Sequence, residues 1–243
     1  MRYELYYWPE IQGRGEFIRL ALEEAGADYV DVARREGKGG VAAMMKFIDD
    51  KSSARPPFAP PYLKVGKLVI AQTANILMYL GPKLGLAPGE ENLLFFAQGL
   101  QLTITDFVAE VHDTHHPIAT DLFYEEQVEE AKARTKSFIK HRMPKFFGYF
   151  ERILNDNPDG GGYAVGARLS CVDLSLFQVI EGLHYAFPRA LKPFRTKYPS
   201  LAALRETIAE RPNIARYLAS ERRIPFNESG IFRRYPELDV AAR

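Results

Sequence analysis

The sequence predicts two domains of different class, an α/β domain over residues 1–85 and an all-α domain over residues 91–243. Two observations support this prediction. Up to Gly85, short apolar runs rich in β-branched and aromatic residues alternate with stretches whose apolar residues recur every three or four positions. From Glu91 onward only the helical period remains. Residues 86–90, LAPGE, have the proline and glycine expected of a linker.

Length and charge favour a protein that acts on small molecules. A chain of 243 residues can bury a sizeable core. Lys and Arg total 32 against 31 Asp and Glu, so no net field attracts nucleic acid or a membrane surface, and we expect neither as a partner.

A single cysteine excludes an internal disulfide framework. Neither a signal peptide nor a long apolar span is evident, so we expect a cytoplasmic protein.

Three segments predict a β–α–β unit at the amino terminus. Residues 2–8 alternate as a strand, residues 17–25 carry the apolar stripe of a helix, and residues 28–33 form a second strand. The helical crossover makes the second strand parallel to the first. Residues 34–55 are charged and contain several glycines, and within them residues 41–48 are predicted to form a short helix.

The strongest local signals lie in the middle of the predicted α/β domain. Two short apolar runs, residues 62–65 and 68–71, flank Gly66-Lys67, a pattern typical of a tight β-hairpin. Apolar residues at helical spacing follow, with Thr73 predicted as the N-cap. Together these elements give the order βαβ–ββα, which is that of a thioredoxin-like domain.

The start of this last helix is a candidate anion site. A helix N-terminus presents free N–H groups and the positive end of the dipole, so a carboxylate can bind against Gln72 and the Thr73 hydroxyl. The alternative is that Thr73 only caps its helix, which is the commoner arrangement. Pro60 and Pro61 lack N–H donors and are predicted to form the approach to the first hairpin strand.

The all-α domain is predicted from four long helical runs, residues 93–112, 125–154, 173–186 and 201–218. Pro144 lies inside the second run and should kink or split it.

Three further features complete this domain. Ser170 and Asp173 are predicted to open the third run as a capping box. Cys171, with no second cysteine, is expected to be a small core residue. Residues 227–243 have no strong period and are predicted to be a surface tail.

The combination of these motifs resembles the cytosolic glutathione transferases. That family has a cis-proline before the third strand, then a hairpin, then a Gln-Ser/Thr pair at a helix start, and here Pro61, the hairpin and Gln72-Thr73 follow in that order. Gly166 followed by the Ser-x-x-Asp box resembles a buried motif of the family's helical domain. The resemblance therefore covers both domains and is strongest to the tyrosine-type classes, those of the sigma, pi, mu and alpha kind.

The resemblance implies that glutathione is the co-substrate, that its thiolate attacks a hydrophobic electrophile, and that no metal takes part. The family activates the thiol with Tyr, Ser or Cys near the end of the first strand, and no Ser, Thr or Cys occurs from Met1 to Lys51. Tyr7 is therefore the predicted catalytic residue, with Tyr6 the alternative if the register shifts. Arg14, at the start of the first helix, is expected to pair with glutathione.

The remaining glutathione contacts implied by the resemblance fall on Pro60, Pro61, Gln72 and Thr73. In the family, the residue before the cis-proline pairs with the cysteinyl backbone through its N–H and C=O, and Pro60 keeps only the acceptor. Asp106 lies 34 residues beyond Gln72, where tyrosine-type relatives carry an Asp that reaches glutathione in the neighbouring subunit. We therefore expect a homodimer.

Three of the five histidines lie within five residues, at His112, His115 and His116. On a helix, His112 and His116 would share a face while His115 diverges, and Pro117 ends the run. We therefore expect packing, or partial lining of the electrophile pocket, and no metal site.

Three functions fit these expectations. The leading one is a glutathione transferase that uses Tyr7. The second is a non-catalytic protein of the same fold that binds glutathione or another ligand. The third is a glutathione-dependent isomerase or peroxidase at the same site.

Overall fold

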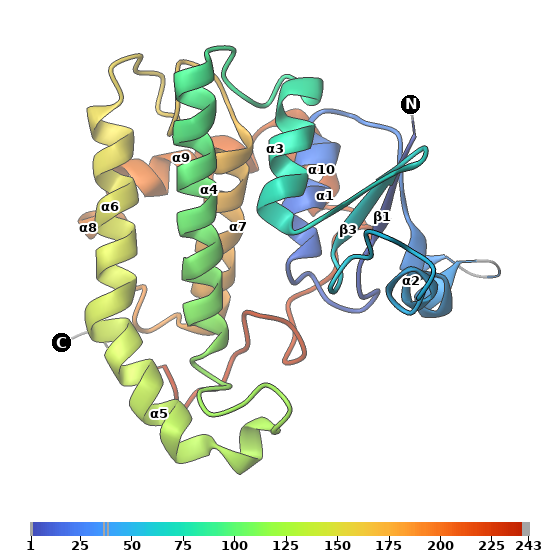
Figure 1. The fold of residues 1–243 in the computed structure, drawn as a ribbon. Helices are drawn as coiled ribbons and strands as arrows, with labels where there is room; N and C mark the ends of the chain where they lie inside the picture. The colour runs from blue at the N-terminus through green and yellow to red at the C-terminus, as the bar shows by residue number, and fades with distance from the viewer. Residues whose placement is uncertain (1, 36, 38, 240–243) are drawn as a thin grey trace.

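The computed structural model describes residues 2–35, 37 and 39–239, which form a sheet-containing unit and a helical unit packed against each other (Figure 1). The sheet has the strand order β2-β1-β3-β4, with β1 parallel to β2 and antiparallel to β3. Its strands are β1 (Tyr3–Tyr6), β2 (Tyr29–Asp31), β3 (Tyr62–Val65) and β4 (Leu68–Ala71). The predicted hairpin is confirmed, because β3 and β4 pair around the turn from Val65 to Leu68.

Helices cover both faces of this sheet. They are α1 (Gly15–Glu24), α2 (Gly40–Ile48) and α3 (Thr73–Leu84). The faces of α1 and α3 pack on one side of the sheet in a single apolar cluster that includes Leu5, Ile18 and Ile76. On the other side, α2 packs through Met44 against Tyr62. The second strand is shorter than predicted because the chain turns into a 3₁₀ helix directly after it.

The remaining elements are helical. They are α4 (Glu91–His112), α5 (Val128–Ser137), α6 (Met143–Asp156), α7 (Cys171–Ala186), α8 (Phe194–Lys197), α9 (Pro199–Ala209) and α10 (Pro212–Leu218). The centre of this unit is α7, most of whose residues are buried. No helix among the described residues is long and apolar enough to cross a membrane.

Prolines divide two of the predicted helical runs. A π-helical segment, Phe138–Arg142, lies between α5 and α6, and Pro144 follows it as the second residue of α6, as expected where a proline interrupts the regular helical ladder. The run predicted over residues 201–218 is wrong as one helix, because α10 begins anew at Pro212. The residue before it, Arg211, is extended, as a residue preceding proline prefers.

The segment predicted as a surface tail, residues 227–243, instead contributes several buried residues to the core. Ile231, Phe232 and Leu238 are buried in the main apolar cluster. The ring of Phe232 lies where a Cβ on Gly182 would come within 2.2 Å, so this glycine of α7 makes room for it. The prediction failed because these apolar residues are irregularly spaced. The last four residues of the chain lie outside the described part.

The capping box predicted at the start of α7 is confirmed. The backbone N–H and the hydroxyl of Ser170 donate to the Asp173 carboxylate at 2.7 and 2.8 Å. A second segment donates as well, since the Ala164 N–H lies 2.7 Å from the other carboxylate oxygen. Asp173 thus fixes both the helix start and the loop before it.

Candidate active site

A cavity of about 280 Å³ lies between the sheet-containing unit and α4. Arg14, Gln72 and Thr73, three of the predicted glutathione-binding residues, line one wall. The opposite wall comes from α4 through Gln98, Gln101, Leu102 and Thr105. A site of this size with mixed apolar and polar walls suits a small-molecule ligand.

The residues on α4 were missed from sequence. Gln98, Gln101 and Thr105 are polar and three or four positions apart, on a helix that is otherwise rich in apolar residues. This spacing places them on one helical face. A polar stripe on a mostly apolar helix was the available signal.

The start of α3 is built differently from the prediction. Thr73 is the first helical residue, and Gln72 is the N-cap, so the prediction of Thr73 as N-cap is wrong. The Thr73 hydroxyl instead donates to the backbone carbonyl of Arg14 at 3.4 Å. Gln72 has φ of 69°, the only positive value for a non-glycine residue in the described chain. Such conformations are uncommon and cluster at functional sites.

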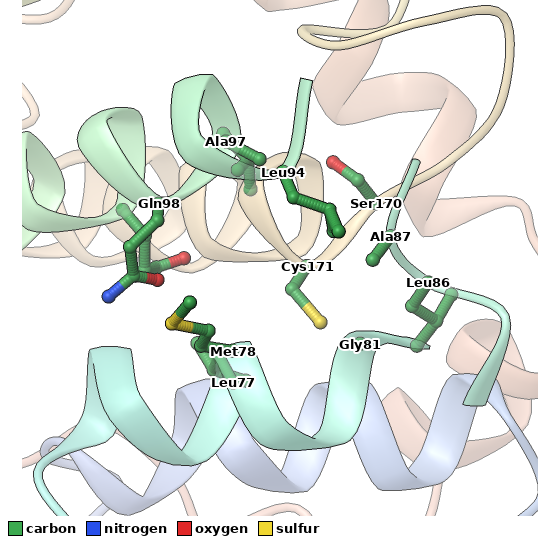
Figure 2. Close-up of a pocket in the computed structure, with 12 residues that line it drawn as sticks. Leu77, Met78, Gly81, Leu86, Ala87, Leu94, Ala97, Gln98, Ser170 and Cys171 are labelled. Atoms are coloured by element: carbon green, nitrogen blue, oxygen red, sulfur yellow. The ribbon is translucent and has the colours of Figure 1, made fainter. Parts of the chain in front are cut away.

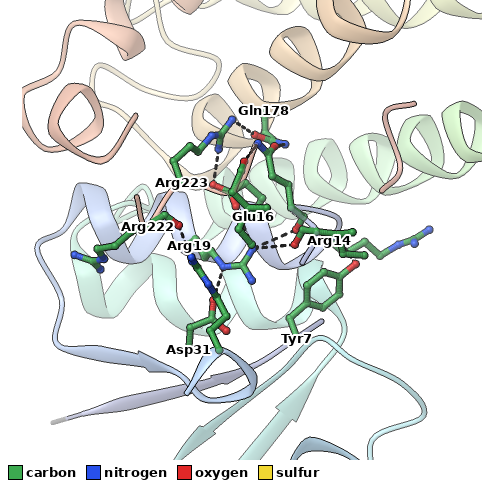
Figure 3. Close-up of polar contacts among 12 residues, drawn as sticks. Tyr7, Arg14, Glu16, Arg19, Asp31, Gln178, Arg222 and Arg223 are labelled. Carbon is green, nitrogen blue, oxygen red and sulfur yellow. Dashed lines mark hydrogen bonds and ion pairs between the residues drawn. The ribbon is translucent and has the colours of Figure 1, made fainter. Parts of the chain in front are cut away.

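Tyr7 lies just beyond β1, and its side chain points at the loop before α1 (Figure 3). Its hydroxyl oxygen accepts a hydrogen bond of 2.9 Å from the backbone N–H of Arg14. Because this bond uses an oxygen lone pair, the hydroxyl proton remains free for donation. Arg14 thereby links Tyr7 to Thr73, so three predicted site residues come together.

Burial raises the pKa of the Tyr7 phenol above its usual value. The Arg14 N–H and the charges of Arg14 and Arg19 oppose this shift but do not cancel it. The phenol therefore keeps its proton at neutral pH, which suits a hydrogen-bond donor.

Two glycines let the loop close over the Tyr7 ring. A Cβ on Gly13 would lie 2.1 Å from the phenol oxygen, and one on Gly15 would lie 2.5 Å from the ring. Gly13 also has φ of 44°, which other residues rarely adopt. Glycine at both positions brings the Arg14 N–H within reach of the hydroxyl.

The alternative residue, Tyr6, faces the other side of the sheet. Its ring stacks on Tyr62 with centroids 4.6 Å apart, and its hydroxyl donates to Glu4 at 2.9 Å. Tyr6 therefore belongs to the cluster under α2, away from the residues that line the cavity.

Comparison with known proteins identifies the family. The model of the glutathione S-transferase C-terminal domain matches residues 112–221. The glutathione S-transferase of Plasmodium falciparum (isolate 3D7) is 30% identical over 224 residues, which cover 90% of this chain and 95% of that protein. The chain belongs to the glutathione S-transferase family. Glutathione S-transferase P 1 of Xenopus laevis is 27% identical, with 91% of this chain and 93% of that protein covered.

Solved structures agree on the fold. Prostaglandin synthase D of Nilaparvata lugens superposes with a TM-score of 0.69 at 22% identity and covers 93% of this chain and 100% of its own. Monomeric Na-GST-3 of Necator americanus superposes with a TM-score of 0.68 at 21% identity and covers 94% of this chain and 100% of its own. The predicted fold class, a thioredoxin-like domain followed by a helical domain, is confirmed. The family also confirms the predicted activity, because its members are enzymes that conjugate glutathione to electrophiles.

Four of the predicted site residues do not line the cavity, and Tyr7 is one of them, although its hydroxyl contacts Arg14 of the wall. The peptide bond between Pro60 and Pro61 is cis, as predicted, and directly precedes β3. Asp106 is exposed on α4, one position after Thr105 of the cavity wall. Neither proline is among the residues that line the cavity, and neither is Asp106.

A buried ion network behind Tyr7 was also missed from sequence (Figure 3). Arg19 Nη1 lies 3.1 Å from Glu16, and its Nε lies 2.7 Å from Asp31. Arg223, from the segment after α10, pairs with the same Glu16 carboxylate. The Arg19 guanidinium lies 5.9 Å from the centroid of the Tyr7 ring. The network joins the carboxy-terminal segment to α1 next to the predicted catalytic residue.

The histidine cluster differs from the helical arrangement expected. α4 ends at His112, and a turn leads to His115 and His116, so helical spacing does not apply. The three rings converge, with centroids 4.8 to 5.0 Å apart. Burial lowers the pKa of all three, to about 4 for His112 and about 2 for His115.

Cys171 is a buried residue, as predicted. Its sulfur faces a small cavity of about 40 Å³ between α3 and α4, with Leu77, Leu86 and Leu94 around it (Figure 2). Burial raises the pKa of the thiol to about 12. A thiol that stays protonated at neutral pH is a poor nucleophile.

Proposed function

We propose that Tyr7 activates glutathione in this transferase by donating a hydrogen bond from its hydroxyl to the thiolate sulfur. The hydrogen bond from the Arg14 N–H to the Tyr7 oxygen carries this proposal, because it orients the hydroxyl and leaves its proton available. A free thiol has a pKa near 8.5, and lowering it by about two units requires ~2.7 kcal/mol. One hydrogen bond to a charged acceptor in a partly desolvated site contributes a free energy of this magnitude.

The activated sulfur then reacts as a nucleophile. The thiol loses its proton to water, the thiolate forms a carbon–sulfur bond to the electrophile, and either a leaving group departs with its electron pair or the adduct takes up a proton from water after conjugate addition. Tyr7 stays protonated throughout, because its task is to stabilise the thiolate and not to remove the proton.

We place glutathione in the cavity between the two units. A glutathione carboxylate would bind at the start of α3 beside Gln72 and Thr73, where backbone N–H groups and the helix dipole favour an anion. The Arg14 guanidinium would pair with a second anionic group. Pro61 would shape the approach to the sulfur, and Pro60 would offer its carbonyl alone to the cysteinyl backbone.

The catalytic function is tested by steady-state conjugation of glutathione to a reactive aryl halide. We expect saturation with both substrates, and competition by S-methylglutathione, which lacks the free thiol. If glutathione binds but no turnover exceeds the buffer reaction with aryl halides or conjugated ketones, the protein is a binder of the same fold.

We further propose that the transferase is a homodimer and that Asp106 of one subunit contacts glutathione in the other. Large apolar side chains remain exposed on β4, α3 and α4, as expected for an interface. They are Leu68, Met78, Phe95, Phe96 and Leu102. Leu102 also lines the cavity, so a partner that covers Leu102 would lie next to the proposed glutathione site.

Light scattering at micromolar concentration should give twice the chain mass of 27.6 kDa. Asp106→Ala should weaken glutathione binding about tenfold, which corresponds to ~1.4 kcal/mol for one charge-assisted contact. Asp121→Ala, which removes an exposed carboxylate from a loop, serves as the control and should bind normally. A monomeric mass would refute the dimer, and unchanged affinity in Asp106→Ala would remove the contact.

A cytoplasmic location is proposed on the basis of the sulfur chemistry. The single cysteine is free and buried, so the fold needs no disulfide and no oxidising compartment.

A further inference from the structure

We propose that His112, His115 and His116 form a binding site for a divalent transition-metal ion of the zinc type. Each histidine offers one ring nitrogen, and these nitrogens all lie within 4.8 Å of one another. His115 and His116 are buried, and His112 is partly buried at the end of α4. Three convergent imidazoles that pack in this way are the ligand set of many zinc sites.

The turn after α4 holds the three rings in place. The backbone N–H groups of His115 and His116 both lie 3.2 Å from the carbonyl of His112. The Thr114 hydroxyl donates to Val111, and the Thr114 carbonyl accepts a bond of 2.8 Å from the Thr135 hydroxyl of α5. The ligands therefore sit on a backbone fixed by several hydrogen bonds, as a site for a metal requires.

The hydrogen bonds of His115 fix its tautomer. Its Nε2 lies 2.8 Å from the carbonyl oxygen of Ile231, and because a carbonyl only accepts, Nε2 must carry the proton. The lone pair of a neutral ring is then on Nδ1, which faces Nδ1 of His116 at 2.6 Å. Metal-binding histidines typically donate their other N–H to a carbonyl in this manner.

Two ring nitrogens so close together need something between them. Without a metal, one of them must carry a proton that bridges the pair. A metal ion replaces this proton and binds both lone pairs. With zinc–nitrogen bonds of about 2.0–2.1 Å in a tetrahedron, the two nitrogens would move apart to roughly 3.3 Å, a shift that side-chain rotation can supply.

The ligand chemistry selects the class of ion. Within the described chain, the group contains imidazoles and no carboxylate or thiolate. Imidazole favours Zn²⁺, Cu²⁺ or Ni²⁺ over Mg²⁺ and Ca²⁺, which prefer oxygen ligands. Three protein ligands leave a coordination position for water. The positive charge of Arg233 acts on all three histidines and opposes a cation.

The metal would fix the turn at the end of α4, which contacts the carboxy-terminal segment. His115 contacts that segment through the Ile231 carbonyl, and Ile231 is buried in the core. A ligand that binds only the folded chain raises its stability, so saturating zinc should raise the thermal midpoint.

The test uses the full chain without an added histidine tag, treated with chelator and kept free of glutathione, whose thiol binds zinc. Calorimetric titration with Zn²⁺ should show one equivalent bound, and Co²⁺ should give the visible absorption of a low-symmetry site.

His116→Gln should weaken binding by about tenfold or more. His141→Gln, which changes an exposed histidine, is the matched control and should bind as the original chain does. Arg233→Gln should bind more tightly.

Equal zinc affinity in the original chain and His116→Gln, or no bound equivalent, overturns the proposal and leaves a hydrogen-bonded histidine cluster. If His116→Gln does not fold, nuclear magnetic resonance of the imidazole nitrogens decides the question in the unmodified chain. Zinc should shift three of the five histidines and leave His141 and His184 unchanged. The absence of such shifts also overturns the proposal.

Discussion

Replacing Tyr7 by phenylalanine is expected to slow conjugation at neutral pH by about ten- to a hundredfold while glutathione binding persists. Phenylalanine keeps the ring that packs against Gly13 and Gly15 and removes only the hydroxyl. The pKa of the bound thiol should return from about 6.5 towards about 8.5, and a rise of about two units lowers the thiolate fraction at pH 7 roughly 25-fold. The variant thus separates activation of the sulfur from its binding.

The ultraviolet absorbance of the thiolate, titrated against pH with glutathione bound, measures this directly. Tyr6→Phe is the matched control, because its hydroxyl contacts Glu4 beneath α2 and not the cavity wall. A shifted titration in Tyr6→Phe with none in Tyr7→Phe would move the role to Tyr6. No shift in either variant would mean that another group stabilises the thiolate.

The parts of the fold that sequence predicted well are decided by neighbouring residues. Gly66 has φ of 61°, so the tight turn needs glycine, and the strands on either side follow from their apolar pattern. The capping box of α7 joins Ser170 and Asp173, three positions apart. The catalytic role of Tyr7 stays a prediction, made because the resemblance required a hydroxyl and the first strand offered no other residue type.

The parts that sequence missed depend on residues far apart in the chain. Glu16 looks like an ordinary helix carboxylate, and its partner Arg223 lies 207 positions away. Phe232 is buried only because Gly182 of α7 leaves space for its ring. The wall formed by Gln101 exists only once α4 packs beside α3. The first two contacts produce no periodic pattern, and the polar stripe on α4 does not show which element it will face.

Replacing Glu16 by alanine is expected to lower the free energy of unfolding by about 3–5 kcal/mol, the usual effect of removing one partner of a buried ion pair. Both Glu16 and Arg19 have side chains with no solvent exposure. Without the carboxylate, Arg19 would keep only Asp31 as a charged partner, and Arg223 would keep only its hydrogen bond to Gln178. The Tyr217 hydroxyl, which donates to Glu16 at 2.6 Å, would also lose its acceptor.

Chemical denaturation of Glu16→Ala and Glu129→Ala compares the loss of unfolding free energy for a buried ion pair with that for an exposed one. Glu129 pairs with Lys132 at the same i,i+3 spacing, but its side chain is 81% exposed. This control should lose less than about 1 kcal/mol. Equal losses in the two variants would show that the Glu16–Arg19 pair is no more important than a surface pair.

The pH dependence gives a second measurement, made with Glu16→Gln, which keeps the size of the side chain. Burial by itself would raise the pKa of Glu16, but the charges of Arg223 and Arg19 outweigh it, and the pKa is lowered from its usual 4.5. A lowered pKa means that the carboxylate stabilises the fold above its usual pKa and that this contribution is lost as the pH falls through the lowered value. The difference in unfolding free energy between the original chain and Glu16→Gln should therefore be constant near neutrality and shrink below about pH 4.5. A difference that stays constant down to the acid transition would show that the charge of Glu16 does not stabilise the fold.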